Sequence, residues 1–164
     1  MRRESGFTAY ELAVTLAVVA VLASVTLPSF LSWLGGHRLR GAAINAVSDI
    51  ETAKIRAIRE NALVAVRFEP DGYRIFIDNG TGSGEAGNFE LDSGERLVQD
   101  RRLPAGVRIP MGELTLSEHC LHFNSRGLPA NLNESDPLPI VIPMVNDTGR
   151  KEISLNRIGS VTTQ

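Results

Sequence analysis

The first long apolar stretch of the chain carries no charged side chain. Between positions 12 and 34 the sequence reads LAVTLAVVAVLASVTLPSFLSWL. At about 1.5 Å of rise per residue, such a stretch forms roughly 35 Å of helix, and a hydrocarbon core is about 30 Å thick. The pattern therefore predicts a membrane-spanning helix. Pro28 lacks a backbone N–H, so we expect this helix to bend near residues 24–28, and Gly35 and Gly36 weaken it again.

After the glycines, apolar residues recur every three or four positions, with charged residues mostly between them. This spacing is typical of an amphipathic helix, which we expect to continue to about Asn61. Most of the recurring residues are small, which favours close packing against a sheet over a ligand-binding role. They are Leu39, Ala43, Ala46, Ile50, Ala53 and Ala57.

Beyond Asn61 the pattern changes to short β-rich runs. Residues 63–69 and 73–78 flank the turn sequence Pro70-Asp71-Gly72 and predict a hairpin. Further strands are predicted at residues 96–101, 107–109, 114–116, 120–124, 140–144 and 152–155, separated by proline and glycine. The fold class is therefore α+β, with one long N-terminal helix packed against an antiparallel β domain.

Composition limits the classes of protein that fit this pattern. A chain of 164 residues with 43% hydrophobic and 22% charged residues suits one ordinary domain and excludes a large multidomain enzyme. The net charge of −2 gives no general attraction to the phosphates of nucleic acid. Cys120 is the only cysteine, which excludes an internal disulfide and argues against a cysteine-built zinc site.

The N-terminus differs from a conventional secretory signal, because Gly6 stands before the apolar stretch and not after it. Arg2 and Arg3 hold this end on the cytoplasmic side by the positive-inside rule, so residues after about Gly36 lie across the membrane. A carboxylate near the bilayer centre costs about 2.5 to 3.5 kcal/mol. Glu11 therefore needs either a cationic partner or a place in the headgroup layer, where its charge favours the helix N-terminus.

A short basic leader followed by a distinctive string resembles the class III signal of type IV prepilins and type II secretion pseudopilins. The string is Gly6-Phe7-Thr8-Ala9-Tyr10-Glu11-Leu12. The resemblance implies that a prepilin peptidase cleaves between Gly6 and Phe7 on the cytoplasmic face and that the new amine of Phe7 is methylated. The sequence departs from the family in having Ala9-Tyr10 where Leu-Ile is usual, and in carrying the acidic Glu4 in its leader.

The same resemblance assigns roles to two residues of the apolar stretch. Glu11 matches the family glutamate, which pairs with the N-terminal amine of a neighbouring subunit as subunits enter a filament. Such pairing is chemically sensible, since a buried carboxylate and a buried ammonium compensate each other's desolvation only when they are paired. Pro28 falls where many pilins have a helix-kinking proline.

The rest of the chain is similar to the GspH/FimT group, which comprises H-type minor pseudopilins and related minor type IV pilins. The matching motifs include Asp71-Gly72-Tyr73, Leu103-Pro104-x-Gly106-Val107, Phe123-x-x-x-Gly127 and the ending Ile153-x-Leu155-Asn156-Arg157-x-Gly159-x-Val161. The resemblance implies a long helix capped by a β-sandwich-like domain. It divides the chain into a leader (1–6), a transmembrane and filament-core helix (7–36), an amphipathic half-helix (37–62) and a periplasmic β-rich domain (63–164).

Some members of this group bind DNA through a C-terminal Gly-Arg-x-Arg motif, in which guanidinium groups contact phosphates. The matching stretch here is Gly159-Ser160-Val161-Thr162, which lacks both arginines. Nearby positive charge comes only from Arg150, Lys151 and Arg157, which we interpret as surface charge. We therefore do not expect nucleic acid as a partner.

His119, Cys120 and His122 form the one cluster with metal-ligand chemistry. On a strand, Cys120 and His122 face the same side and His119 the other, and no third ligand stands at a useful spacing. We expect a buried strand cysteine flanked by surface histidines. No catalytic arrangement of nucleophile and base is evident, so we predict no enzyme activity, no metal and no cofactor.

Residues 78–95 read DNGTGSGEAGNFELDSGE and form a Gly-rich acidic loop. Its oxygen-bearing side chains leave calcium binding open, although Gly80 and Gly82 stand where an EF-hand loop has Asp or Asn. We expect a flexible surface loop, which is a plausible contact for neighbouring subunits or secreted substrates.

Taken together, the sequence predicts a non-enzymatic minor pseudopilin of a type II secretion system in the bacterial inner membrane. Its expected partners are other pseudopilins in a periplasmic filament, the prepilin peptidase and the inner-membrane assembly platform. Two alternatives stay open: a minor subunit of a type IV pilus, and a periplasmic binding domain held permanently by an uncleaved helix.

Overall fold

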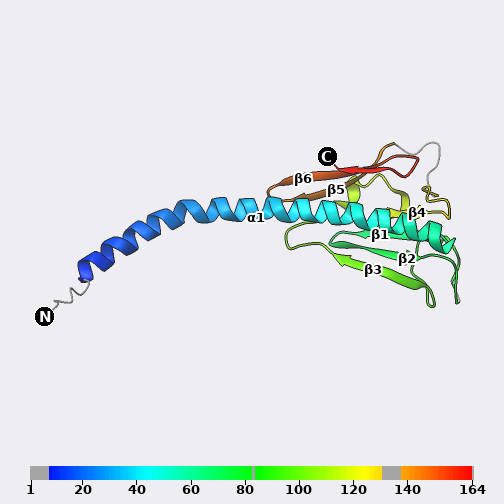
Figure 1. Cartoon of the computed structure of the whole chain (residues 1–164), viewed down its shortest axis with the longest axis horizontal. Helices are drawn as coiled ribbons and strands as arrows, with labels where there is room; N and C mark the ends of the chain where they lie inside the picture. The colour runs from blue at the N-terminus through cyan, green and yellow to red at the C-terminus, as the bar shows by residue number, and fades with distance from the viewer. Residues whose placement is uncertain (1–7, 83, 131–137, 164) are drawn as a thin grey trace.

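In the computed structural model the described residues are 8–82, 84–130 and 138–163. One long helix, α1 (Ala9–Glu60), dominates the shape (Figure 1). Its N-terminal half projects away from the β strands, and its C-terminal half runs between two groups of them (Figure 1). The fold class is therefore α+β, as predicted, with the long helix packed against antiparallel sheets.

Both ends of α1 are set by local chemistry. Thr8 caps the N-terminus in an extended conformation, and Asn61 ends the helix in the left-handed region at φ 48°. The backbone N–H of Asn61 donates to the carbonyls of Ala57 and Ile58, which closes the last turn. The end at Asn61 agrees with the prediction. The helix continues without interruption through Pro28, Gly35 and Gly36.

The first sheet has the strand order β3-β2-β1-β4, with every neighbouring pair antiparallel. Its strands are β1 (Val64–Glu69), β2 (Gly72–Ile77), β3 (Arg96–Arg102) and β4 (Cys120–Phe123). The predicted hairpin is confirmed, with register from Val64 opposite Ile77 to Glu69 opposite Gly72. An irregularity between Ile75 and Phe76 shifts the pairing of β2 with β3.

The second sheet contains β5 (Ile140–Asn146), β6 (Gly149–Leu155) and β7 (Val161–Thr163), in that order. The sequence pattern did not predict β7, because three residues are too few to show alternation. Figure 1 shows β5 and β6 on the opposite side of α1 from β1, β2 and β3, and contacts join the helix to both sheets.

Two predicted strands, at residues 107–109 and 114–116, are wrong. Arg108 makes only an isolated bridge with Val145, and residues 114–116 lie between the short 3-10 helices η1 (Met111–Glu113) and η2 (Ser117–His119). Val107, Ile109 and Leu116 are nevertheless buried in the core. These residues are apolar because their side chains fill the core from an irregular segment. The prolines and glycines of that segment keep its backbone out of a sheet.

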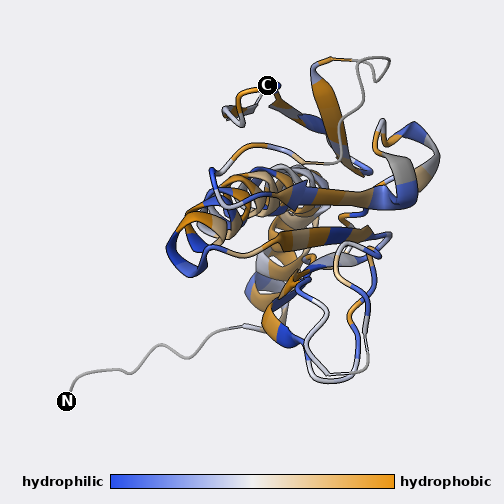
Figure 2. Ribbon diagram, turned by 90° about the vertical axis from the view of Figure 1, so that its right-hand side faces the viewer, coloured by the Kyte–Doolittle hydropathy of each residue, from blue (hydrophilic) through white to orange (hydrophobic). Residues whose placement is uncertain are grey.

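The core lies between α1 and the two sheets, and small residues allow their close approach. Ala46, Ile50, Ala53 and Ala57 are fully buried, as the sequence spacing predicted. Apolar residues are visible on the helix and on the strands beside it (Figure 2). The larger core side chains come from both sheets and include Phe68, Tyr73, Phe123, Ile142, Met144 and Ile153.

Polar contacts fix the C-terminal half of α1 to the domain. The Asp49 carboxylate accepts hydrogen bonds from the Tyr73 hydroxyl at 2.7 Å and from Arg101 Nε at 2.9 Å. Burial, together with the Asp49 charge, raises the pKa of Tyr73, so its hydroxyl stays a donor. Nearer the helix end, Lys54 Nζ donates to the carbonyl oxygen of Gly159 at 2.8 Å.

The turn between β5 and β6 meets α1 where the helix leaves the domain. Asn146 Nδ2 donates to the Gly35 carbonyl oxygen at 2.8 Å. A Cβ at position 35 would lie 2.6 Å from Thr148 Cγ2, whereas a Cβ at Gly36 would meet nothing within 4 Å. Gly35 therefore permits the turn to dock on the helix at the end of the apolar stretch.

Candidate functional site

The N-terminal half of α1 exposes a long apolar surface. Every residue from Thr8 to Trp33 is exposed except Ala23, which is partly exposed. The exposed large side chains include Leu12, Leu16, Val18, Leu22, Val25, Leu27, Phe30 and Leu31. A contiguous apolar surface of this size on a soluble monomer marks a membrane or protein interaction site. The helix is long and apolar enough to cross a membrane.

Three hydroxyl groups within this half donate to carbonyl oxygens of the helix itself. The hydroxyl of Thr15 donates to the Leu12 carbonyl at 2.8 Å, and that of Ser24 donates to the Val21 carbonyl at 2.7 Å. Thr26 Oγ1 donates in the same way to the Leu22 carbonyl at 2.8 Å. No hydroxyl among these three needs water, which suits a helix surrounded by hydrocarbon.

Glu11 lies in a capping box with Thr8 at the N-terminus of α1. The backbone N–H and the hydroxyl of Thr8 each donate to Glu11 Oε2 at 3.0 Å, and the Glu11 N–H donates to Thr8 Oγ1 at 3.3 Å. The carboxylate thus satisfies two donors at a helix end whose dipole favours negative charge. The Thr-x-x-Glu spacing is a known signal for this motif, and it is a feature that the sequence analysis missed.

The remaining residues of the predicted N-terminal site are placed as follows. Gly6 and Phe7, with Arg2, Arg3 and Glu4, lie outside the described residues. Pro28 lies inside the continuous helix α1, whose N-terminal half is curved (Figure 1). A kink located at Pro28 remains a prediction, as do cleavage and methylation.

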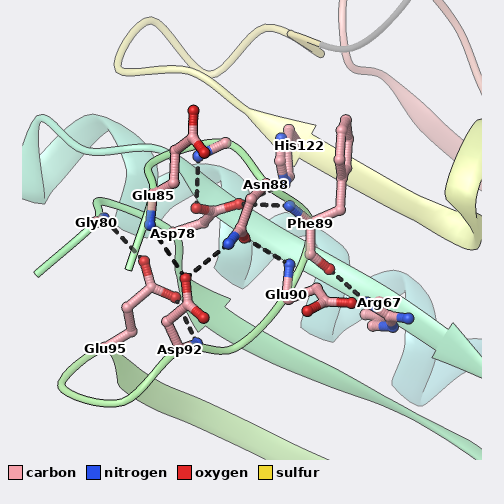
Figure 3. Close-up of polar contacts among 11 residues, drawn as sticks. Arg67, Asp78, Gly80, Glu85, Asn88, Phe89, Glu90, Asp92, Glu95 and His122 are labelled. Atoms are coloured by element: carbon pink, nitrogen blue, oxygen red, sulfur yellow. Dashed lines mark hydrogen bonds and ion pairs between the residues drawn. The ribbon is translucent and has the colours of Figure 1, made fainter. Parts of the chain in front are cut away.

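In the predicted loop, the described residues 78–82 and 84–95 are held by three carboxylates (Figure 3). Asp78 accepts from the backbone N–H of Gly87 at 2.6 Å and of Phe89 at 3.3 Å. Asp92 accepts from Glu85 N at 3.2 Å and Asn88 Nδ2 at 2.6 Å, and Glu95 accepts from Gly80 N at 2.9 Å and from Asp92 N at 3.1 Å. This loop therefore uses its acidic side chains to hold its own backbone.

The loop also covers the outer face of the first sheet. Phe89 stacks on the His122 ring at a centroid distance of 4.4 Å, and Phe89 and Leu91 pack against Ala65, Phe76 and Cys120. Arg67 Nη1 donates to the Phe89 carbonyl at 2.6 Å and ties the loop to β1. The loop therefore lies at the surface, as expected, and through Phe89 and Leu91 it also forms a packed cover over part of the first sheet.

This cover explains why the prediction of surface histidines is wrong for His122. His122 is 3% exposed, and its Nε2 lies 3.0 Å from Oδ2 of the fully buried Asp78. Burial lowers the pKa of His122, although the Asp78 charge acts in the opposite direction. His119 is exposed, as predicted, and has φ 55°.

Cys120 is buried, as predicted, and burial raises the pKa of its thiol to about 12. A thiol that stays protonated at neutral pH is a poor nucleophile. Among the described residues, no three His, Cys, Asp or Glu side chains are grouped so as to hold a metal ion. The side chains of β4 are thus buried in the core.

Positive charge near the C-terminus is partly neutralised within the fold. Arg150 forms ion pairs with Glu113 and with Glu152, the latter with Arg150 Nε at 2.6 Å from Oε1. Arg157 is exposed, and Lys151 is half-buried on β6. The three residues that were considered for phosphate contact therefore do not form one free basic cluster.

Solved structures of a minor pseudopilin and of a type IV minor pilin share this fold. The minor pseudopilin EpsH from the Type 2 Secretion System of Vibrio cholerae is 12% identical, and the match covers 77% of this chain and 96% of that chain with a TM-score of 0.54. The type IV minor pilin FimU of Pseudomonas aeruginosa is also 12% identical and covers 78% of this chain and 89% of that chain, with a TM-score of 0.53. A second crystal form of FimU gives a TM-score of 0.51.

No family model matches the chain, and no curated protein matches it by sequence. At 12% identity the structural matches establish the fold. The chain therefore has the type IV pilin-like fold that the resemblance to the GspH/FimT group implied.

Proposed function

We propose that this chain is a minor pseudopilin of a type II secretion system, a non-enzymatic subunit that assembles into a periplasmic filament through the apolar half of α1. The observation that carries the proposal is that this half of α1 is exposed on all sides, whereas the β domain buries its own apolar core. Burying one Leu or Val side chain is worth about 1.5 to 3 kcal/mol. A helix with many such side chains must therefore be covered, first by lipid and then by the helices of other subunits.

Glu11 has a specific role in this proposal. Cleavage after Gly6 would create a free amine on Phe7, next to Thr8 in the capping box. Until a neighbouring subunit arrives, the Glu11 carboxylate is held at the helix end by Thr8. In the filament it would exchange these contacts for the N-terminal amine of the neighbour and set the register between the two helices, since each charge offsets the other's desolvation.

The proposal places the chain in the inner membrane before assembly, with the β domain in the periplasm. The prepilin peptidase would remove residues 1–6, the new Phe7 amine would be methylated, and an inner-membrane assembly platform would draw the helix out of the bilayer. The likeness to EpsH, which is described as a minor pseudopilin of a type 2 secretion system, supports this choice of system.

A minor subunit of a type IV pilus is the second candidate, and the likeness to FimU supports it with a nearly equal TM-score. The same processing and helix packing would serve either machine. Gene neighbours discriminate between them: secretin and pseudopilin genes indicate secretion, whereas retraction-motor and major-pilin genes indicate a pilus. The third class, a permanently anchored binding domain, makes no use of Glu11 in assembly.

Photo-cross-linking tests assembly directly. A photoreactive amino acid replaces Val18, which is 54% exposed on the apolar half, and the matched control carries it at the exposed Asp100 on β3. In the native host we expect Val18 adducts with other pilin-like subunits. These adducts should disappear when the assembly platform is deleted or when Glu11 is changed to Ala, while the chain stays in the membrane. Adducts that are unaffected by both changes would support the permanent anchor instead.

A further inference from the structure

A cavity of about 380 Å³ lies where α1 leaves the β domain. One wall is the helix from Leu31 to Arg38, and the other is formed by the turn between β5 and β6 together with residues that follow β3. In Figure 1 that turn and the end of the β3 arrow both lie at the end of the domain from which α1 emerges. The cavity therefore opens at the boundary between the apolar stretch and the domain.

The walls of this cavity change from apolar to charged along the helix axis. Leu31 and Leu34 belong to the apolar stretch, and Arg38 lies one turn beyond that stretch. Asp147, in the turn between β5 and β6, also lines the cavity. Arg38 and Asp147 are both exposed, and within the described residues neither enters an ion pair. One cavity thus combines apolar side chains with a cation, Arg38, and an anion, Asp147, that do not form an ion pair with each other.

We infer that this cavity binds the headgroup of an aminophospholipid of the phosphatidylethanolamine type. The Arg38 guanidinium would donate to the phosphate, which it can contact through two parallel N–H groups. The Asp147 carboxylate would accept from the primary ammonium, and Leu31 and Leu34 would contact the upper part of an acyl chain. The inference rests on the membrane placement of α1 in the proposed function, and it does not depend on filament assembly.

The charges argue for this lipid over the two other common headgroup types. An anionic headgroup would satisfy Arg38 but would meet the like charge of Asp147. A choline headgroup carries its positive charge without an N–H, so it cannot donate to the Asp147 carboxylate. The level of the site is also suitable, because Trp33 belongs to the same turn of α1 as Leu31 and Leu34, and tryptophan is enriched at membrane interfaces.

A second cavity at the same level serves as an internal comparison. It is lined by Trp33, Gly36, His37 and Arg40, and among the residues that the structure describes no acidic side chain lines it. Trp33 packs edge-on against His37 at a centroid distance of 4.2 Å. The two cavities therefore lie at the same level of α1 and both contain an arginine, but Asp147 lines only the first.

Tryptophan quenching by lipids with brominated acyl chains tests the inference on the full chain in phosphatidylcholine vesicles. The native chain has one tryptophan, Trp33, which reports on lipid at the second cavity. A chain with Leu31→Trp and Trp33→Phe places the reporter in the wall of the first cavity. Brominated phosphatidylethanolamine, phosphatidylcholine and phosphatidylglycerol are compared at the same low mole fraction.

We expect phosphatidylethanolamine to quench the Leu31 reporter more strongly than either other lipid, by about two- to fivefold, which is the selectivity that one exposed charge pair provides. The native Trp33 reporter should show no such preference. Asp147→Asn and Arg38→Gln should each remove the preference, whereas Arg40→Gln and Asp100→Asn should leave it unchanged.

Equal quenching by phosphatidylethanolamine and phosphatidylcholine at the Leu31 reporter would overturn the inference, as would a preference that survives Asp147→Asn. Quenching by phosphatidylglycerol as strong as that by phosphatidylethanolamine would also overturn it. If no lipid quenches either reporter, α1 is not in the bilayer, and the membrane placement in the proposed function fails together with this site. Loss of filament assembly alone, measured by cross-linking at Val18, would leave the lipid preference intact.

Discussion

His122 Nε2 and Asp78 Oδ2 lie 3.0 Å apart in the interior. His122 belongs to β4, and Asp78 is the first residue of the loop that covers the first sheet. Asp78 is 0% exposed and also accepts from two backbone N–H groups of that loop, so this one carboxylate joins the loop to the sheet. Removing a buried carboxylate that several donors share is costly, because each of those donors is then left without an acceptor in a place that water does not reach.

We predict that Asp78→Ala destabilises the protein by about 2 to 4 kcal/mol, since it leaves the N–H groups of Gly87 and Phe89 and the His122 ring without their acceptor. Chemical unfolding of the full chain in detergent measures the change, and hydrogen exchange at Gly87 and Phe89 locates it. Glu90→Ala, an exposed acid in the same loop, is the matched control and should fall within about 0.5 kcal/mol of wild type. Equal stability of the two variants would contradict the role of Asp78.

The pH dependence of stability should carry a contribution from His122. Burial lowers its pKa below the ordinary value of 6.5, so the unfolded chain binds a proton at a higher pH than the folded chain does. Stability from this group is therefore complete above pH 6.5 and falls as the pH drops below that value towards the folded pKa. Thermal unfolding between pH 7.5 and about pH 5 measures the effect. His122→Gln should flatten this part of the pH profile of stability. An unchanged slope in the variant would contradict a contribution from His122.

Gly35 should be needed for the docking of the β5–β6 turn. Gly35→Val places a side chain against Thr148 and should weaken the hydrogen bond from Asn146, at a cost of about 1 to 3 kcal/mol for overpacking. Gly36→Val has the same effect on helix propensity, but its side chain points into open space. The difference between the two variants therefore measures the contact with Thr148 alone. Thermal unfolding of both variants provides the comparison. Equal melting temperatures would show that the turn does not depend on this approach.

Cys120 should be chemically inert in the folded protein. It is fully buried, and its pKa of about 12 leaves almost no thiolate at neutral pH. Intact-mass measurement after treatment with iodoacetamide should find no adduct in the native state and one adduct after denaturation. Rapid labelling of the native chain would mean that the cover formed by Phe89 and Leu91 opens readily.

The sequence pattern predicted the elements that follow a regular period. The helix from the apolar stretch to Asn61 and the β1–β2 hairpin were predicted in this way, because apolar spacing and turn residues define them locally. The capping box of Thr8 and Glu11 was also readable from its spacing, although it was not recognised.

Features that depend on distant parts of the chain were not predictable from local pattern. His122 was assigned to the surface because nothing near it in sequence shows that residues 78–95 fold over it. Ile109 and Leu116 suggested strands, but they fill the core from an irregular segment. The docking of Thr148 on Gly35 joins residues that are far apart in sequence, and no periodicity reports such a contact.

The most direct test of the central claim is the N-terminus and intact mass of the protein extracted from the membranes of its own host. We predict a chain that begins at methylated Phe7 and lacks residues 1–6, and we predict that Gly6→Val abolishes this processing. A wild-type chain that still begins at Met1 would contradict the pilin-like pathway and would identify α1 as a permanent anchor.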